Sequence, residues 1–373
     1  MSLLVKSLNG DTTFLITFAP LIAPDHCRQK FPGAFTVLVD PWLVGHSSIW
    51  NAKFQISHHT SKPVVSSLVE LPRPDLIVIS QAKPDHCHRE TLCTLPRATD
   101  IPILAVPEAA KQIRSWRYFD SSVKIITLNE YDRNKTCTVY CVKLDPYTSN
   151  TAPGRLTFAV VNEKNDMTGL HNAIGITYRP PGTSFINKSG CLVDLPMIPP
   201  QSPDRVSPAP RPSSRGTTAS FDQPPRSASG ADSPMAGQVF DKSQPLPERT
   251  ISILYSPHGM NYSRLAPFVE THLAAQQALP LQALFHSINV EQNPKIMGGL
   301  VARGLPGGLE FVQKMGARYW ISSHDEVKDN RGWATVWIKS RPYSLSEAQS
   351  ILDREVKDKV RLAVLDAGQQ LVI

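Results

Sequence analysis

The strongest constraint on the fold is a proline- and serine-rich tract over residues 196–249, which interrupts a chain otherwise rich in strand-like segments. The tract holds 12 of the 33 prolines and nine serines, and it has almost no aliphatic periodicity. Such a composition buries too little apolar surface to offset the entropy lost on ordering, so we predict that the tract is disordered. Because closing a long loop costs little more than closing a short one, such an insertion can interrupt a single domain.

The flanking segments predict one interrupted domain in two parts, residues 1–195 and 250–373, the second with a C-terminal extension. Runs rich in β-branched and aromatic residues predict strands at 12–18, 35–39, 76–79, 103–106, 123–126, 136–142, 155–162, 251–255, 281–285, 319–322 and 334–338. Helices are expected at 89–95, 108–116, 262–277 and 309–315, and a mobile loop at 300–306 between two glycine pairs. Strands with interposed helices predict a layered α+β fold.

Charge and cysteine usage favour an ordinary intracellular surface. The formal charge is +7, from 39 basic and 32 acidic residues, without a run of five like charges, so we expect no nucleic-acid partner. The six cysteines form no Cys-x-x-Cys pair, which favours a reducing compartment. No stretch approaches 18 consecutive apolar residues, so we expect a cytoplasmic protein, or one also present in the nucleus, without an integral membrane segment.

Polar residues that can bind a metal follow several predicted strands. One strand ends on Asp40, a second runs into a loop with Asp85 and His86, and a third ends before His324. Two further strands lead to His258 and to His286. Carboxylate and imidazole are suitable ligands for a divalent ion such as zinc. The sequence therefore predicts a metal site where these strands end.

The chain resembles the metallo-β-lactamase superfamily, most closely the branch of lactonases and N-acyl-phosphatidylethanolamine phospholipase D. The resemblance lies in the order of elements, in the phrase Leu-Val-Asp-Pro-Trp-Leu at 38–43, and in the loop after residue 79. It covers about residues 10–165 and 250–340 and implies a four-layer αββα sandwich. The family motif His-x-His-x-Asp-His is degenerate here, because Gln81 and Lys83 stand in place of its first two histidines.

The resemblance implies that one of the two family metal sites is lost and one is kept. The kept site would use Asp85, His86 and His324, with His258 as a possible fourth ligand, because this histidine stands where the family has a bridging aspartate. No convincing counterpart of the family's middle histidine is present. Asp40, Gln81 and His286 are candidates to orient the ligands or to line the pocket, and the candidate catalytic residues are Asp85 and Lys83.

Two functions fit this pattern. The first is a hydrolase with one divalent metal, zinc being the expected ion, that acts on a small ester, lactone, amide or phosphodiester. The second is an inactive pseudoenzyme that binds a ligand or a protein, in which the ammonium of Lys83 replaces the metal and pairs with Asp40 or Asp85. In either case the tract 196–249 could dock a protein partner.

Overall fold

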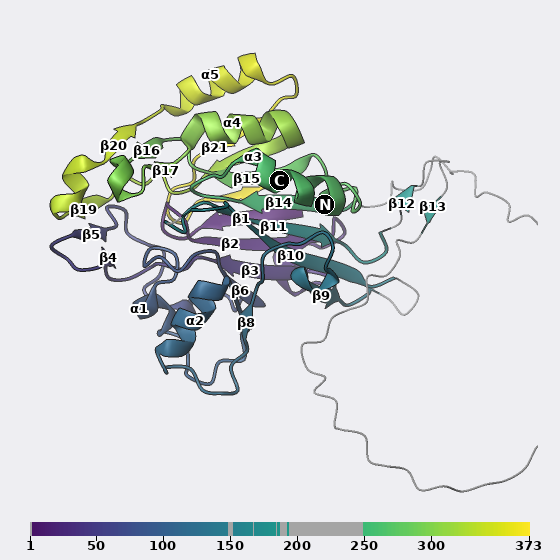
Figure 1. Ribbon diagram of the computed structural model, residues 1–373. Coiled ribbons are helices and arrows are strands. Elements are labelled where there is room, and N and C mark those ends of the chain that lie inside the picture. Colours follow the sequence, from purple (N-terminus) through teal and green to yellow (C-terminus); the bar gives the residue numbers. More distant parts are fainter. Residues whose placement is uncertain (1, 148–151, 167, 184, 187–191, 194–248) are drawn as a thin grey trace, which may run out of the picture.

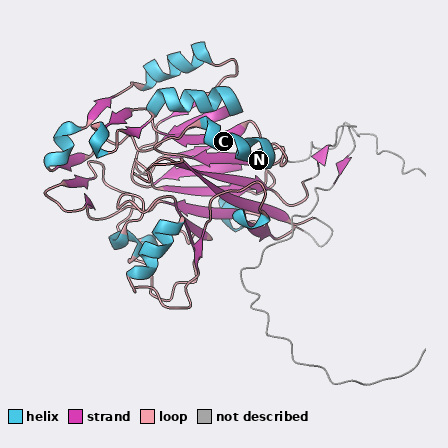
Figure 2. Cartoon of the chain, in the orientation of Figure 1, coloured by secondary structure: helices cyan, strands magenta, loops and turns pink. Residues whose placement is uncertain are grey.

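The computed structural model describes residues 2–147, 152–166, 168–183, 185–186, 192–193 and 249–373. Apart from its last residue, the tract 196–249 lies outside this described part. Two seven-stranded sheets form the centre of the molecule, and helices lie outside them (Figures 1 and 2).

The first sheet joins the beginning of the chain to its end. In spatial order its strands are β22 (Gln370–Val372), β1 (Ser2–Ser7), β2 (Phe14–Ala19), β3 (Phe35–Val39), β6 (Leu76–Ile79), β7 (Ile103–Ala105) and β8 (Ile125–Thr127). The pairs β22–β1, β1–β2 and β2–β3 are antiparallel, whereas the pairs β3–β6, β6–β7 and β7–β8 are parallel. Strand β6 is buried along its whole length, as expected of an apolar run in a parallel sheet.

The second sheet contains strands from before and after the tract. Its order is β21 (Arg361–Ala363), β18 (Ala317–Ser322), β15 (Leu281–His286), β14 (Ile251–Tyr255), β11 (Asn172–Arg179), β10 (Gly154–Asn162) and β9 (Tyr140–Leu144). Strands β11 and β14 are antiparallel, with Tyr178 opposite Ile251. The chain therefore leaves the sheet and returns to it at neighbouring positions.

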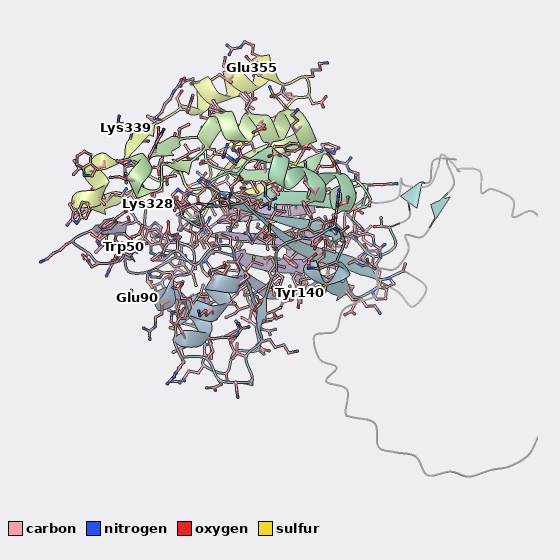
Figure 3. All side chains as sticks on the ribbon, in the orientation of Figure 1. Trp50, Glu90, Tyr140, Lys328, Lys339 and Glu355 are labelled. Carbon is pink, nitrogen blue, oxygen red and sulfur yellow. The ribbon has the colours of Figure 1, made fainter. Side chains whose placement is uncertain are left out.

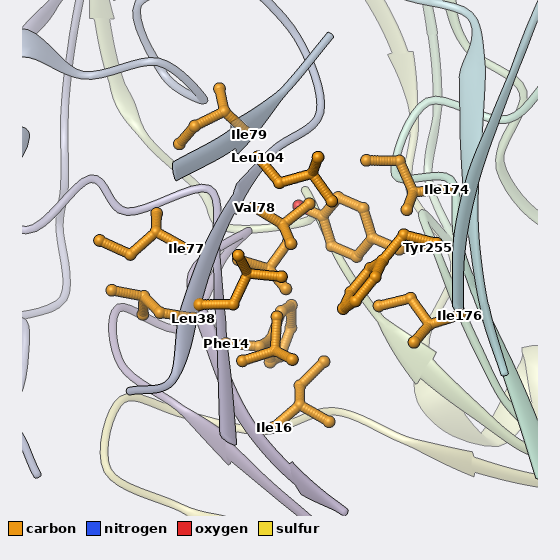
Figure 4. Close-up of a cluster of buried hydrophobic side chains, with 14 of the residues drawn as sticks. Phe14, Ile16, Leu38, Ile77, Val78, Ile79, Leu104, Ile174, Ile176 and Tyr255 are labelled. Atoms are coloured by element: carbon orange, nitrogen blue, oxygen red, sulfur yellow. The ribbon is translucent and has the colours of Figure 1, made fainter. Parts of the chain in front are cut away.

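The main core lies between the two sheets. Phe14 and Ile16 of β2 face Ile174 and Ile176 of β11 across this core, with Tyr255 beside them (Figure 4). Successive residues of a strand point to opposite faces, so Ile253 of β14 joins this core while Leu254 points away from it.

Helices cover the outer face of each sheet. Helix α2 (Pro107–Ser115) buries Ala109, Ala110 and Ile113 on its inner face against the first sheet, near the short α1 (Arg89–Leu92). A second core, beyond the second sheet, is completed by α3 (Tyr262–Phe268), the π-helical turn η4 (Val269–Leu273), α4 (Gly304–Met315) and α5 (Leu345–Glu355). The predicted four-layer αββα sandwich is thus confirmed.

Three smaller sheets and several short helices complete the described structure. The sheets are β4 (Ser47–Ile49) with β5 (Gln55–His58) and β19 (Asp329–Arg331), β16 (Val290–Gln292) with β17 (Leu300–Ala302) and β20 (Lys339–Arg341), and β12 (Phe185–Ile186) with β13 (Leu192–Val193). The 3₁₀ helices are η1 (Asp25–Lys30), η2 (Leu68–Glu70), η3 (Thr136–Thr138), η5 (Lys295–Met297) and η6 (Trp333–Trp337). No helix in the described ranges is long and apolar enough to cross a membrane.

Three local predictions are wrong in whole or in part. The strand expected at 136–142 begins as the 3₁₀ helix η3, and only residues 140–142 of it belong to β9. The predicted strand at 334–338 is the 3₁₀ helix η6, and the expected mobile loop at 300–306 contains β17 and the first turn of α4. At Gly308 a Cβ would lie only 2.1 Å from the ring of Trp320. Gly308 therefore lets α4 pack closely on β18 and serves helix–sheet packing instead of loop mobility.

Candidate metal centre

Four strand ends meet at one edge of the sandwich. Asp40 follows β3, the loop with Asp85 and His86 follows β6, His258 follows β14, and His324 follows β18. In each sheet the strands concerned are parallel, so their carboxyl ends lie at the same edge, where ligand sites of α/β folds are commonly built.

Asp40 is the buried hub that orients the site. Its Oδ1 accepts a hydrogen bond from the Ser80 backbone N–H at 2.7 Å, and its Oδ2 accepts from the Ser80 hydroxyl and from the Tyr255 hydroxyl at 2.9 Å. Nδ1 of His86 lies 2.7 Å from the same Oδ2. A buried carboxylate needs such partners, and this one fixes a proton on Nδ1 of His86.

His86 and His258 face each other through their Nε2 atoms, which are 3.2 Å apart. The Nδ1 of His258 lies 3.1 Å from the Val301 carbonyl oxygen, which can only accept, so this Nδ1 also carries a proton. In their neutral forms both Nε2 atoms then present a lone pair to the other. A cation, either a proton on one ring or a metal ion, must therefore lie between them.

His324 and Asp85 border the same point. Nε2 of His324 lies 3.3 Å from Oδ2 of Asp85, and Nε2 of His86 lies 3.9 Å from that oxygen. One ligand atom from each of His86, His258 and His324 lies within 4.8 Å of the others, so the three imidazoles could hold a metal ion. His324 has a φ of +71°, an uncommon backbone conformation outside glycine.

The electrostatics of the group follow from burial and from two carboxylates. Burial, reinforced by His324 and His86, lowers the pKa of His258 well below its usual value, so this ring is neutral. Burial alone would also lower the pKa of His86, but Asp85 and Asp40 outweigh it and raise that pKa. Burial would raise the pKa of Asp85, yet His86 and His324 hold it well below its ordinary value.

A buried ion pair beside this group was not predicted from the sequence. Nζ of Lys328 lies 2.7 Å from Oδ2 of Asp11, and the backbone N–H of His324 donates to the Asp11 carbonyl oxygen. Burial would lower the pKa of Lys328, but Asp11 and Asp85 raise it. The sequence could have indicated Lys328, which lies four residues after His324. It could not have indicated Asp11, which lies in a turn far away in sequence.

Lys83 does not make the ion pair expected of it. Among the described residues, no carboxylate lies within ion-pair distance of its ammonium, and its contribution is a backbone carbonyl that accepts from the N–H groups of His86 and Cys87. Lys83 therefore helps to form the turn that carries Asp85 and His86. The counter-ion role assigned to it is not seen, because its side chain does not reach Asp40 or Asp85.

The two other candidate residues are also buried. The side-chain amide of Gln81 is buried and donates to the Leu170 carbonyl oxygen at 2.9 Å. His286 is buried under Gly259, where a Cβ would lie 2.4 Å from its Nε2, and burial lowers its pKa to about 4. Within the described residues, Nε2 of His286 and Oε1 of Gln81 have no hydrogen-bond partner.

His171, directly before β11, is another histidine in the middle of the chain. It is not available as a metal ligand in this arrangement, because two backbone carbonyls hold its ring. Its Nδ1 and Nε2 each lie 2.9 Å from a carbonyl oxygen, of Gly259 and of Leu300 respectively. Both nitrogens are thus engaged, and the ring links the loop before β11 to the segments after β14 and at β17.

Comparison with known proteins gives structural likeness only. No protein family matches the chain, and no curated protein matches it. An isothiocyanate hydrolase from Delia radicum gut bacteria has 12% identity and a TM-score of 0.48, covering 100% of this chain and 98% of its own. A metallo hydrolase from Ignicoccus hospitalis has 10% identity and a TM-score of 0.46, and the match covers 100% of this chain and 99% of that protein. A possible metal-dependent hydrolase from Veillonella parvula has 10% identity and a TM-score of 0.48, and the match covers 100% of this chain and 99% of that protein.

Proposed function

We propose that the chain is a hydrolase with a single divalent metal, held by His86, His258, His324 and Asp85. The observation that carries this proposal is the 3.2 Å contact between the Nε2 atoms of His86 and His258, both of which have their Nδ1 proton committed elsewhere. Two facing lone pairs repel each other unless a cation separates them.

The donor set fits zinc. Tetrahedral ligands with Zn–N distances near 2.0–2.1 Å imply nitrogen–nitrogen separations of about 3.3 Å, close to the separation of the two Nε2 atoms. A proton would need two nitrogens only, whereas a third imidazole and a carboxylate also converge here. Three imidazoles and one carboxylate suit zinc or iron, and zinc is the ion we expect.

The residues of this chain then have distinct tasks. Asp40 holds the His86 ring in the tautomer whose Nε2 lone pair faces the site, as carboxylates behind metal-bound histidines do. The Val301 carbonyl oxygen does the same for His258. A divalent metal, when bound, supplies Lewis-acid polarisation of an ester, lactone, amide or phosphodiester and a lowered pKa for water. Asp85, partly exposed on its loop and with a lowered pKa, is placed as a metal ligand.

Metal content tests the proposal directly. Elemental analysis of the purified protein should give about one zinc, iron or manganese ion per chain, and His258→Ala and His86→Ala should each lose it. The control is His26→Ala, because His26 is exposed and far from the site in sequence. Protein that stays free of metal after incubation with these ions, or His258→Ala protein that retains full metal content, would contradict the proposal.

A non-catalytic binding module is the second candidate, and one observation favours it. This function requires an ammonium group in place of the metal. Lys328 supplies a buried ammonium near the imidazole group, in its ion pair with Asp11. In this case Lys328 balances the local carboxylates without a metal. We place either form of the protein in the cytoplasm or the nucleus, and the tract 196–249 stays a proposed docking segment for protein partners.

A further inference from the structure

An exposed aromatic surface lies on the small sheet next to the candidate metal centre. We define this surface, the tryptophan surface, by the side chains of Trp50, Val327, Trp333, Val336 and Trp337. They are exposed by 85%, 83%, 57%, 81% and 57% respectively, and they include every exposed tryptophan of the described chain. Apolar side chains of this size rarely gather in the open without a partner.

The tryptophan surface is built by two segments that are distant in sequence. The β4–β5 hairpin and the helix η6 are joined by β19, which pairs with β5, and by hydrogen bonds from the N–H groups of Trp333 and Ala334 to the carbonyl oxygens of Lys53 and Phe54. The ring of Phe54 lies 4.5 Å from that of Trp50 and 4.7 Å from that of Trp333. Trp50, Phe54 and Trp333 therefore form a contiguous aromatic cluster. The strands β4, β5 and β19 beside it lie at the left of Figure 1.

The backbone holds these side chains outward. Trp50 has a φ of +60°, which is strained for a bulky residue and turns it away from the core at the tip of the hairpin. In the 3₁₀ helix η6, Trp333 and Val336 are three residues apart and share one face. Strain at an exposed tryptophan indicates a position held for contact rather than for folding.

Cations frame the tryptophan surface. Lys53 is exposed on the β4–β5 turn, and Lys339 and Arg341 are exposed on β20, which follows η6; among the described residues none of the three has a carboxylate partner. Arg331 is also exposed, but it pairs with Asp329, the one carboxylate of β19. Trp50 and Lys339 both lie at the left of the molecule in Figure 3.

We propose that the tryptophan surface docks the protein onto an anionic phospholipid membrane. Tryptophan is the residue best suited to the membrane–water interface, and unpaired lysine and arginine around it attract anionic headgroups. Single-stranded nucleic acid could stack on the tryptophans, but the two valines offer it no stacking face, whereas both valines can enter the headgroup–acyl boundary. The surface is a peripheral contact and stands whether or not the site is catalytic.

Docking would bring the membrane next to the candidate metal centre. Strand β19 begins directly after Lys328, and its partner β5 ends on His58, next to His59. His59 lies 2.5 Å from Glu326, two residues after His324. The segment around β5 and the segment from His324 to β19 thus contribute both to the tryptophan surface and to the surroundings of the candidate metal centre.

Vesicle binding of the full chain tests the proposal. We expect co-sedimentation with vesicles of phosphatidylcholine and phosphatidylserine to be on the order of 100-fold tighter than with phosphatidylcholine alone, as three unpaired cations imply. High salt should remove most of the difference. Tryptophan fluorescence should shift to the blue and be quenched by lipids brominated in the acyl chain. Equal binding to both vesicle types, or no binding at all, would overturn the proposal.

Two pairs of variants localise the contact. Val336→Ser with Trp337→Ser should lower vesicle binding at least about tenfold, and Lys339→Glu with Arg341→Glu should remove the preference for phosphatidylserine. The matched controls are Leu21→Ser with Ile22→Ser, another exposed apolar pair, and Lys111→Glu with Lys124→Glu, another exposed basic pair; both should bind as the wild type does. If sedimentation velocity shows a self-associated form that only the first pair abolishes, or if the surface binds single-stranded RNA instead of vesicles, the proposal is wrong.

Discussion

Asp40 acts on the candidate metal centre through another residue, because its carboxylate touches the Nδ1 side of His86 and not the Nε2 side. The backbone of Asp40, at a φ of +43°, is held in an uncommon conformation by the Thr13 hydroxyl, which donates to its carbonyl oxygen at 2.8 Å. Such a position is expected to affect metal affinity rather than metal identity.

Replacing Asp40 by asparagine therefore weakens metal binding without removing a ligand. The amide no longer selects the proton position on His86, and we expect a loss of about 10–100-fold in zinc affinity, measured by competition with a chelator. Asp75→Asn is the matched control, since Asp75 accepts a backbone N–H at 2.7 Å from Thr36, away from the centre. Unchanged zinc affinity in Asp40→Asn would contradict the positioning role.

The two lysines near the site differ in what their removal leaves behind. Lys328→Met leaves the fully buried carboxylate of Asp11 without a cation, which typically costs about 3–5 kcal/mol of unfolding free energy. Lys83→Met breaks no ion pair among the described residues and should change stability by less than about 0.5 kcal/mol. Urea unfolding of both variants decides which lysine is the internal counter-ion, and equal losses would contradict our assignment to Lys328.

The sequence was sufficient to predict the ligands, because their residue types stand at strand ends. It was not sufficient to predict their hydrogen-bond partners. Asp40, His86, His258 and His324 each follow an apolar strand, so their pattern is local in sequence. The pair of Asp11 with Lys328 joins two loops that only the closed sandwich brings together. Lys83 looked like the counter-ion because sequence places it beside Asp85, but a side chain's direction depends on the turn that carries it.

At the scale of elements, ten of the fourteen strands in the two large sheets were predicted, because they are apolar runs, whereas β1, β11, β21 and β22 were missed. The segment 334–338 has the same composition as such a strand but became a 3₁₀ helix, since the N–H groups of Trp333 and Ala334 are taken by the β4–β5 turn. Propensity is a weak guide when partners come from elsewhere in the chain.

The π-helical turn η4 carries a histidine that makes stability depend on pH. His272 is buried, its Nε2 lies 3.1 Å from the Thr157 hydroxyl oxygen, and burial lowers its pKa to about 4. Between pH 6.5 and about 4 the unfolded chain binds a proton here that the folded chain does not. Stability must therefore fall as the pH falls through this window, by roughly 3 kcal/mol from this group.

His272→Gln should remove that part of the pH dependence. The measurement is the unfolding free energy of wild type and variant at several pH values, and the difference between them should vary across the window and be constant above pH 7. Since His286 also has a pKa lowered to about 4, the wild type alone cannot identify the group. A difference that stays constant from pH 4 to pH 7 would contradict the assignment.

At the scale of the whole molecule, the neighbouring positions of Tyr178 and Ile251 predict that the tract can be shortened. A chain that leaves and re-enters a sheet on adjacent strands needs only a short connection, and the length of that connection has little effect on stability. We expect deletion of residues 200–245 to leave the thermal midpoint nearly unchanged, as measured by calorimetry. A large decrease would show that the deleted residues contribute to the folded core, against the predicted single interrupted domain.

The pairing of β22 with β1 also bears on the order in which the protein can fold during synthesis. Leu4 lies opposite Val372, so β1 gains this neighbour only after the chain between β1 and β22 has been synthesised. Until then that side of β1 is an open sheet edge, which is prone to pair with other chains. The first sheet is therefore completed only after β22 has been synthesised, and until then a nascent chain carries an open edge on β1.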